Sequence, residues 1–226
     1  MATILITGAN RGLGLEFTRQ YAAEGATVIA CCRNPAKAQA LKAIVGNVTI
    51  KPLDVADSAS VDRLAADLKG TPIDILIANA GVFGPEKQEA DESDYEGFIE
   101  TFRVNSVAPL MVAQAFKDNL LRGKDKKLVV LTSKMGSISD SSGGTLAYRA
   151  SKAALNMIMH GVAQAWEKDG IAVCILHPGW VQTDMGGPGA LITPQHSIEG
   201  MKEQIAKLTL KTSGHFIDYK GRSISW

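Results

Sequence analysis

Two residues capable of proton chemistry stand four positions apart in the second half of the chain. Tyr148 and Lys152 lie in a segment rich in helix formers, so their side chains should share one face of a helix. An ammonium beside a phenol favours the phenolate, which lowers the tyrosine pKa from about 10 and yields a proton donor near neutral pH. Ser133 follows an apolar run that reads as a strand, and a Ser, a Tyr and a Lys at this spacing can converge on one carbonyl oxygen. For the pair alone, the alternative is a surface Tyr and a surface Lys without a shared role.

The amino-terminal segment supplies the context for this pair. A β-branched run over residues 2–7 leads into Gly8, Gly12 and Gly14, and a helical pattern follows over residues 15–23. In a strand–turn–helix order, glycines let the backbone approach a pyrophosphate, whose charge is met by free amides and by the helix dipole. The spacing is Gly-x-x-x-Gly-x-Gly, not the commoner Gly-x-Gly-x-x-Gly. Its position between a strand and a helix favours a dinucleotide site over a plain tight turn.

These motifs resemble the short-chain dehydrogenase/reductase family, and the likeness covers essentially all 226 residues. Within the family, residues 177–187 and 214–219 are similar to the branch that contains C-factor and the sniffer-type carbonyl reductases. The resemblance implies a catalytic group of Ser133, Tyr148, Lys152 and Asn105. The cofactor-binding residues expected from the motifs are Gly8, Asn10, Arg11, Gly12, Leu13, Gly14, Arg33, Asp54, Val55, Asn79, Ala80, Gly81, Tyr148, Lys152, Pro178, Gly179, Val181 and Thr183.

The resemblance also implies a role for each catalytic residue. Ser133 would donate a hydrogen bond to a substrate carbonyl oxygen, and Tyr148 would protonate the developing alkoxide. Lys152 would lower the tyrosine pKa and hydrogen-bond the nicotinamide ribose. Asn105 would hold, through its backbone, a water linked to Lys152. Its alternative role is the N-cap of a helix expected over residues 106–120.

Two further motifs have a structural alternative beside the implied one. Asp54 is similar to the family's adenine-contacting aspartate, but it also suits a helix cap, as do Asp57 and Ser58. Asn79 and Gly81 are similar to residues that shape the adenine-ribose side of the cleft, although Asn-Ala-Gly is also an ordinary strand exit.

The remaining sequence predicts one α/β domain over residues 1–226. Apolar runs that alternate with helical patterns predict a parallel sheet with helices on both faces, a doubly wound (Rossmann) fold. The resemblance implies seven strands in the order 3-2-1-4-5-6-7, with the ligand outside their carboxyl ends. The strand-like runs are 2–7, 26–32, 47–53, 73–78, 127–133, 171–177 and 214–217.

The end of the second strand-like run predicts the choice of cofactor. An NAD site usually has an acid there, whereas an NADP site has a basic residue. Arg33 stands at this place without a neighbouring acid, and Arg11 in the glycine loop adds a second positive charge that should face the same phosphate. The sequence therefore predicts NADPH rather than NADH. The alternative for Arg33 is a solvated residue that opens a loop.

Composition narrows the class of protein. Lys and Arg number 24 against 23 acids, so charge gives no argument for nucleic acid or a membrane surface. No apolar stretch approaches the roughly 18 residues of a membrane span, and we expect no cleaved signal sequence. The three cysteines fall in strand-like runs and the four histidines are scattered. We therefore expect buried reduced thiols, no metal site and a cytoplasmic protein.

The sequence says less about the substrate. A short flexible lid rich in Gly and Pro is expected between residues 185 and 195, which suggests an open cleft. Apolar residues expected at the walls of the cleft favour aldehydes, ketones or quinones over charged sugars. For each of these residues, the alternative is simple packing. The candidates for the pocket walls are Phe83, Met135, Trp180 and Met185.

Two functions of different classes follow. The first is an NADPH-dependent carbonyl reductase, and the second is a cofactor-binding regulatory or signalling protein of C-factor type. The complete Ser133, Tyr148 and Lys152 set favours the enzyme. The resemblance implies a homodimer or homotetramer through the helices near residues 106–121 and 150–167. Their apolar residues suit packing on the sheet or on a partner: Leu110, Val112, Phe116, Leu155, Met159, Val162 and Trp166.

Overall fold

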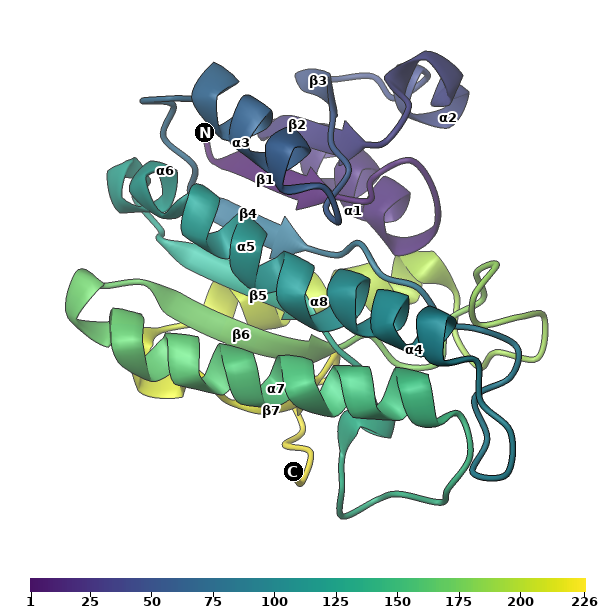
Figure 1. Ribbon diagram of the computed structural model, residues 1–226. Helices are drawn as coiled ribbons and strands as arrows, with labels where there is room; N and C mark the ends of the chain where they lie inside the picture. Colours follow the sequence, from purple (N-terminus) through teal and green to yellow (C-terminus); the bar gives the residue numbers. More distant parts are fainter.

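A single seven-stranded sheet forms the centre of the protein, whose computed structural model describes all 226 residues (Figure 1). Every strand pairs in parallel with its neighbours, in the order β3-β2-β1-β4-β5-β6-β7. The predicted doubly wound topology is therefore confirmed. The strands are β1 (Thr3–Thr7), β2 (Thr27–Cys32), β3 (Val48–Pro52), β4 (Ile75–Ala78), β5 (Lys127–Leu131), β6 (Ala172–His177) and β7 (Phe216–Asp218).

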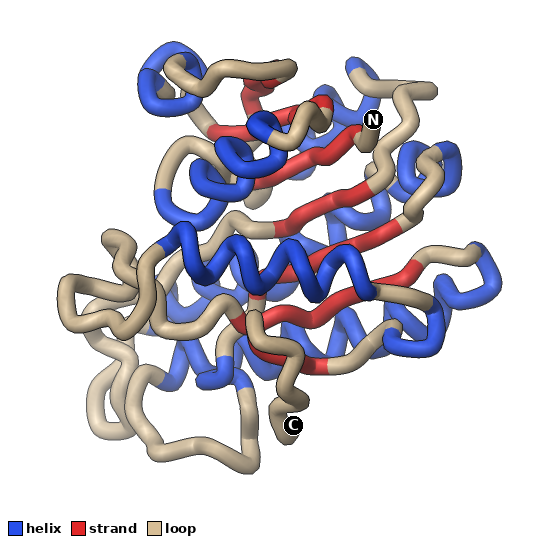
Figure 2. Tube along the Cα trace, turned by 180° about the vertical axis from the view of Figure 1, so that it is seen from behind, coloured by secondary structure: helices blue, strands red, loops and turns tan.

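Helices cover both faces of this sheet. The first face carries α3, α5 and α7, in front of the sheet in Figure 1, and the opposite face, seen in Figure 2, carries α1 and α8. The helices are α1 (Gly12–Ala23), α2 (Gln39–Lys42), α3 (Ser58–Asp67), α4 (Tyr95–Phe102), α5 (Ala108–Ala115), α6 (Lys117–Arg122), α7 (Leu146–Trp166) and α8 (Pro194–Lys207). Short 3-10 turns lie at Pro35–Lys37, Lys134–Gly136, Glu167–Asp169 and Leu210–Thr212, and a π-helical turn at Arg103–Val107.

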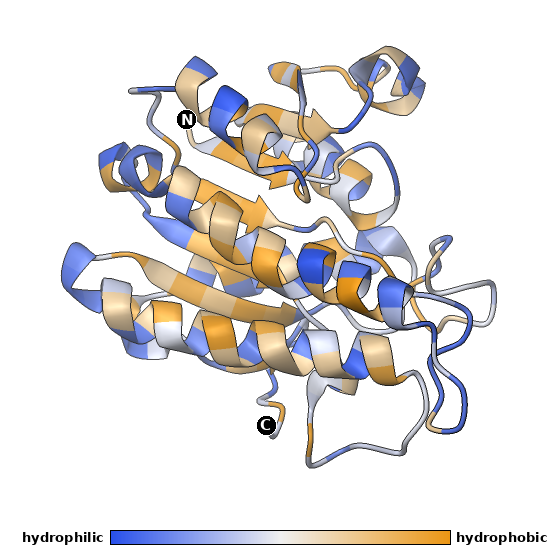
Figure 3. Cartoon of the chain, viewed as in Figure 1, coloured by the Kyte–Doolittle hydropathy of each residue, from blue (hydrophilic) through white to orange (hydrophobic).

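Two hydrophobic cores lie between the sheet and these helices. Successive side chains of a strand point to opposite faces, so Leu5 joins the core under α3, α5 and α7, while Ile4 and Ile6 join the core under α1 and α8. Because both faces are covered, the strands read as continuous apolar runs (Figure 3). Cys31 and Cys32 also fall into different cores, and all three cysteines are free and buried. The thiol state thus agrees with the prediction.

The helix predicted over residues 106–120 starts earlier than expected. The helical backbone begins at Tyr95, where Asp94 accepts a hydrogen bond from the Gly97 amide at 3.0 Å, and it continues through the π turn into α5. Asn105 therefore lies inside a helix and is not an N-cap. The sequence signal was misread because the capping residue stands eleven positions earlier, after a polar loop.

The apolar residues of α5 and α7 named above pack on the sheet. Val112, Phe116, Leu155, Met159, Val162 and Trp166 belong to one core, and Leu110 packs against it. A different set of apolar side chains, on α4, the π turn and α7, is exposed to solvent: Tyr95, Ile99, Val107 and Met157. The sequence did not indicate that these residues are exposed.

Candidate active site

The predicted site residues gather where four parallel strands end. Thr7 closes β1, Ala78 closes β4, Leu131 closes β5 and His177 closes β6, and these strands are neighbours in the sheet. The glycine loop, the Asn79–Gly81 motif, Ser133 and the Pro178–Gly179 turn follow directly. In a doubly wound fold this edge is the ligand-binding edge.

Backbone geometry shapes the glycine loop between β1 and α1. Gly8 and Gly12 have φ angles of 65° and 52°, a region that other residues rarely adopt. A Cβ atom on Gly14 would lie 2.4 Å from the Gly8 carbonyl oxygen, so no larger residue fits. Asn79 ties this loop to β4, since its Nδ2 donates to the carbonyls of Thr7 at 2.8 Å and Gly8 at 3.1 Å. The loop is therefore held close against the sheet.

The amino terminus of α1 keeps its first amides free of side-chain partners. The residue at the N-cap, Arg11, is extended and makes no capping hydrogen bond, and the first turn contains no acid. Free amides and the positive end of the helix dipole suit a pyrophosphate. This geometry fits a dinucleotide cofactor, with Asn10, Arg11 and Leu13 in the loop that would surround it.

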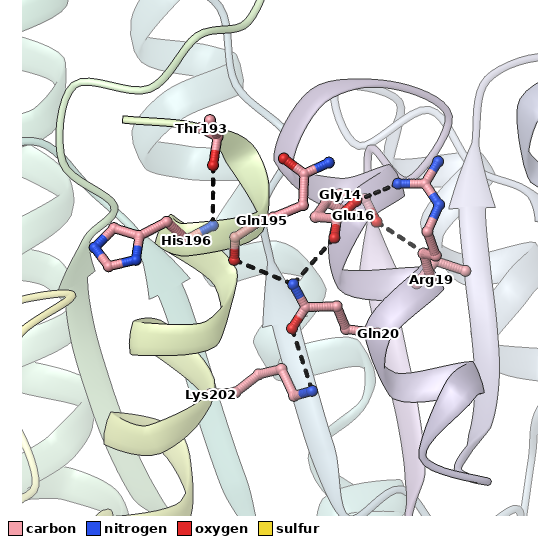
Figure 4. Close-up of polar contacts among 9 residues, drawn as sticks. Gly14, Glu16, Arg19, Gln20, Thr193, Gln195, His196 and Lys202 are labelled. Carbon is pink, nitrogen blue, oxygen red and sulfur yellow. Dashed lines mark hydrogen bonds and ion pairs between the residues drawn. The ribbon is translucent and has the colours of Figure 1, made fainter. Parts of the chain in front are cut away.

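Helix α1 is fastened to α8 through Gln20 (Figure 4). The Gln20 Nε2 donates to the buried carboxylate of Glu16 at 3.0 Å and to the Gln195 carbonyl at 3.2 Å. Lys202 of α8 donates to Gln20 Oε1 at 3.3 Å. These contacts fix the position of α1 relative to α8.

The two arginines predicted near the cofactor phosphate differ in their surroundings. Arg33 is exposed directly after β2 and belongs to no ion pair. Arg11 pairs with Asp184, in the loop between β6 and α8, at 3.1 Å, and both side chains are largely exposed. Arg11 thus has a partner that the sequence did not suggest. Arg33 is the unpaired charge.

Asp54 does not cap the helix that follows it. Helix α3 begins at Ser58, and Asp57 caps it by accepting from the Ala59 amide at 3.0 Å. Asp54 instead accepts from the Ala56 amide at 3.0 Å within the turn that also contains Val55. The helix-cap alternative for Asp54 is therefore wrong. Its proposed contact with an adenine stays a prediction.

Tyr148 and Lys152 are both buried on the inner face of α7, with exposures of 8% and 6%. The Lys152 Nζ donates to the Leu131 carbonyl at 2.9 Å and lies 5.8 Å from the centre of the Tyr148 ring. Ser133 Oγ accepts a hydrogen bond from the Met135 amide at 3.1 Å, and the Ser133 hydroxyl lies close enough to Tyr148 to lower its pKa. The alternative of a surface Tyr–Lys pair is excluded. The three side chains do converge.

The electrostatics of the pair differ from the prediction. Burial raises the Tyr148 pKa above its ordinary value, and the nearby Ser133 hydroxyl offsets only part of that increase. Burial also lowers the Lys152 pKa to about 8. The expected lowering of the tyrosine pKa by Lys152 is not found, because desolvation outweighs attraction across this distance. Burial thus disfavours the charged form of both groups.

Asn105 lies in the π turn, and its side chain contacts both the segment after β4 and helix α7. Its amide exchanges hydrogen bonds with the backbone of Val82, at 2.9 Å and 2.8 Å, and donates to Ser151 Oγ at 3.0 Å. A Cβ atom on Gly81 would lie 3.2 Å from the Asn105 side chain and 3.6 Å from the Lys152 Nζ. Asn105, Gly81 and Lys152 are therefore close neighbours. The water role of Asn105 stays a prediction.

The four residues expected to line the substrate pocket differ in exposure and in contacts. The Phe83 ring lies 4.9 Å from the Tyr148 ring, centre to centre, and remains partly open to solvent. Trp180 and Met185 are half-exposed on the lid, and Met135 is partly buried beside Ser133. Phe83 is the one of the four whose side chain packs on the Tyr148 ring.

The loop between β6 and α8, which contains the expected lid, is held by hydrogen bonds within the loop. Val181 pairs with Ile192, the Trp180 Nε1 donates to the Gly186 carbonyl at 2.8 Å, and Gln182 Nε2 donates to the Ala190 carbonyl at 3.0 Å. Pro178 and Gly179 lead into this loop, and Thr183 lies next to Gly12. The expected flexible segment is a loop with close ends and many internal hydrogen bonds.

Sequence reasoning missed two buried polar residues of the site. Ser151 is fully buried, and its Oγ donates to the Tyr148 carbonyl at 2.8 Å. Gln88, in the loop before α4, accepts a hydrogen bond from the Tyr148 amide at 3.0 Å. Ser151 lies inside the Tyr–Lys motif, so its position was a usable signal. A glutamine in a polar loop carries none.

Known proteins resemble this chain in sequence and in fold. The family model for "short chain dehydrogenase" matches residues 2–189. The C-signal protein of Myxococcus xanthus is 42% identical over 156 residues, which are 69% of this chain and 93% of that protein. An NADPH-bound carbonyl reductase from chicken fatty liver is 34% identical with a TM-score of 0.93, over 100% of this chain and 99% of the other. The carbonyl reductase Sniffer of D. melanogaster is 30% identical with a TM-score of 0.92, over the whole of both chains. No helix of this chain has the length and apolar character needed to cross a membrane.

Proposed function

The chain belongs to the short-chain dehydrogenase family, and from this premise we propose that it is an NADPH-dependent carbonyl reductase. The predicted family and branch are confirmed by the likeness to C-signal and to two carbonyl reductases. The observation that carries the proposal is the buried group of Ser133, Tyr148 and Lys152 at the carboxyl edge of the sheet. A cofactor-binding protein without turnover has no need for a proton donor there.

The residues of the chain supply the acid side of the reaction. Ser133 holds the carbonyl oxygen, and Tyr148 transfers its phenolic proton to that oxygen as the C=O bond becomes a C–OH bond. Lys152 then restores the phenol's proton, with Asn105 and a water as the relay to solvent. NADPH, when bound, supplies the hydride to the carbonyl carbon.

The choice of NADPH is supported by Arg33 and by one structural relative. Arg33 has no acidic partner, so its planar guanidinium remains available to a ribose phosphate. The chicken carbonyl reductase, which this chain resembles over its whole length, was solved with NADPH bound. The proposed cofactor residues are those of the glycine loop, Arg33, Asp54–Val55, Asn79–Gly81 and the Pro178–Thr183 segment.

The substrate proposed is an uncharged aldehyde, ketone or quinone. Phe83 beside Tyr148 and the exposed Trp180 and Met185 after β6 present apolar surface, which favours an apolar substrate body. The test is steady oxidation of NADPH at 340 nm with a panel of such carbonyl compounds. Turnover with at least one of them is expected. Silence across the panel, together with tight NADPH binding, would contradict the proposal.

That silent outcome would support a second function. The identity of 42% to C-signal favours a regulatory or signalling protein that binds NADP(H) with little turnover. In that case the Tyr148→Phe variant should signal as well as the natural chain. For a reductase whose product carries the signal, the variant should be inactive.

We also propose a homodimer or homotetramer in the cytoplasm. An apolar hollow on the outer side of α4 and the π turn is lined by Phe98, Ile99, Phe102 and Val107 and suits a second subunit. The three free, buried thiols fit a reducing compartment. Light scattering should give at least twice the 24.0 kDa chain mass, and a monomer mass would contradict the assembly.

A further inference from the structure

Gln88 is buried in a segment whose neighbouring side chains are exposed. Its exposure is 2%, and it lies in the connection between β4 and α4. The Nε2 donates to the carbonyls of Phe83 at 3.2 Å and Pro85 at 2.9 Å, and the Oε1 accepts from the Tyr148 amide at 3.0 Å. A buried amide is costly unless its donors and acceptor are satisfied, and here all are. One side chain therefore joins the loop of Phe83 to the backbone of Tyr148.

The first turn of α7 has no cap of its own. Thr145 stands at the N-cap position, but its side chain makes no capping hydrogen bond. The amides of a first helical turn lack partners within the helix and need acceptors from elsewhere. Residues 88 and 89 provide them: the Leu146 amide donates to the Gln88 carbonyl at 2.8 Å, and the Thr145 amide to Glu89 Oε1 at 3.0 Å. The catalytic helix is thus capped from a distant segment.

The backbone that enters α7 also depends on this segment. Gly143, Gly144 and Thr145 have consecutive φ angles of 77°, 67° and 46°. A left-handed conformation costs a non-glycine residue about 1 kcal/mol or more, so it persists only where contacts determine it. For Thr145 these contacts are the hydrogen bond to Glu89 and those of the next amides to Gln88.

The segment is rigid enough to act as a support. The Glu89 amide donates to the Glu92 carbonyl at 3.0 Å, and the Asp94 amide donates to the Lys87 carbonyl at 2.9 Å. Gln88 and Ser93 form an antiparallel bridge. Asp94 then caps α4, so the support is continuous with the helix that carries Asn105.

We propose that Gln88 is a positioning residue for Tyr148: it holds the tyrosine amide and the Phe83 carbonyl together, and so sets the phenol against Ser133 and the substrate. The phenol and the Phe83 ring pack at 4.9 Å between centres, so a shift of either backbone moves the proton donor. This inference rests on the reductase function proposed above. It adds a residue that touches neither substrate nor cofactor.

The test replaces Gln88 by Met, which keeps the length of the side chain and removes its three hydrogen bonds. We expect kcat to fall between about tenfold and a hundredfold, the size of effect that a small misplacement of a catalytic group produces. The KM for NADPH should stay within about twofold, because the glycine loop and Asn79 do not contact Gln88. The alkaline limb of the kcat profile should move to higher pH, since a displaced phenol moves away from the Ser133 hydroxyl that lowers its pKa.

A matched control separates positioning from loss of fold. Asn119 is a second buried amide, 4% exposed, that donates to the carbonyls of Leu68 at 2.7 Å and Thr71 at 2.8 Å far from the site. Asn119→Leu should lower the melting temperature and leave the pH profile of kcat unchanged. If Gln88→Met does not fold, Gln88→Asn, which is too short to reach that amide, takes its place with the same expectations.

A measurement without turnover completes the test. Hydrogen–deuterium exchange of the peptide that covers residues 145–150 should be faster in Gln88→Met than in the natural chain, and unchanged in Asn119→Leu. Unchanged exchange, or a kcat and pH profile equal to those of the natural chain, would overturn the role of Gln88. Failure of the natural chain to turn over any carbonyl would instead overturn the proposed function, and the exchange result would still decide whether Gln88 holds α7.

Discussion

On the cofactor side of the site, backbone geometry positions the binding groups. Gly8 and Gly12 adopt left-handed φ angles, and Gly14 has no room for a Cβ atom. On the catalytic side, buried polar side chains do the same work across long sequence separations. Asn105 makes hydrogen bonds with Val82 and Ser151, and Gln88 accepts a hydrogen bond from the amide of Tyr148, sixty residues away.

This difference separates how each side responds to change. The catalytic side contains Tyr148 and Lys152, and burial disfavours the charged form of both. We therefore expect pH to act on the catalytic side. Steric changes should act most on the cofactor side.

Removal of the proton donor should leave the cofactor side intact. Tyr148→Phe keeps the ring that packs on Phe83 and removes only the hydroxyl. We expect kcat to fall by between about a hundredfold and ten-thousandfold, the usual contribution of a general acid, while NADPH binding is retained. Stopped-flow turnover and fluorescence titration with NADPH measure the two effects. A kcat equal to that of the natural chain would refute the role of Tyr148.

The buried Lys152 should make stability depend on pH. Its pKa is about 8 when folded against about 10.5 when unfolded, so between these values the unfolded chain binds more protons and the free energy of unfolding rises with pH. The destabilising effect of the charge is complete below about pH 8. Compared with Lys152→Met, the natural chain should gain roughly 2 to 3 kcal/mol between pH 7 and pH 10. Urea unfolding of both chains at each pH measures this, and parallel curves would show that the amine is not buried.

A methyl group in the glycine loop should affect only cofactor binding. In Gly14→Ala the new Cβ atom meets the Gly8 carbonyl at 2.4 Å, so α1 must shift away from the loop. We expect the NADPH dissociation constant to rise between about tenfold and a hundredfold, as overpacking costs roughly 1 to 3 kcal/mol. Isothermal titration with NADPH measures it.

Gly161→Ala is the matched control for that substitution. Gly161 lies on the exposed side of α7 with nothing within 4 Å of an added Cβ atom. Alanine there should stabilise the helix by roughly 0.5 to 1 kcal/mol and leave NADPH affinity unchanged. Equal affinities for the two alanine variants would mean that the space around Gly14 is not restricted.

The same division explains what was predictable from the sequence. Continuous apolar runs and glycines in a strand–turn–helix order are local signals, so the sheet order and the glycine loop followed from them together with the family resemblance. The Tyr148 pKa did not follow, because burial depends on the packing of α7 against the rest of the fold. Gln88 was missed since Tyr148, whose amide it holds, lies sixty positions away, and the start of the helix at Tyr95 was missed because its cap lies in a polar loop.

Arg33 provides the smallest and most specific test of the cofactor side. Its guanidinium is exposed and unpaired, so it should interact with the phosphate of NADPH through water-screened attraction and a planar pair of hydrogen bonds. Arg33→Asp should raise the KM for NADPH by about tenfold, equivalent to about 1.4 kcal/mol, and leave the KM for NADH unchanged or lower. Arg33→Met removes the charge without adding a repulsive one and should give a smaller rise. Because both charges are exposed, the effect should shrink as salt is increased. An unchanged ratio of the two KM values would show that Arg33 does not contact the cofactor. Arg11 of the glycine loop, which pairs with Asp184, would then be the remaining candidate for the phosphate.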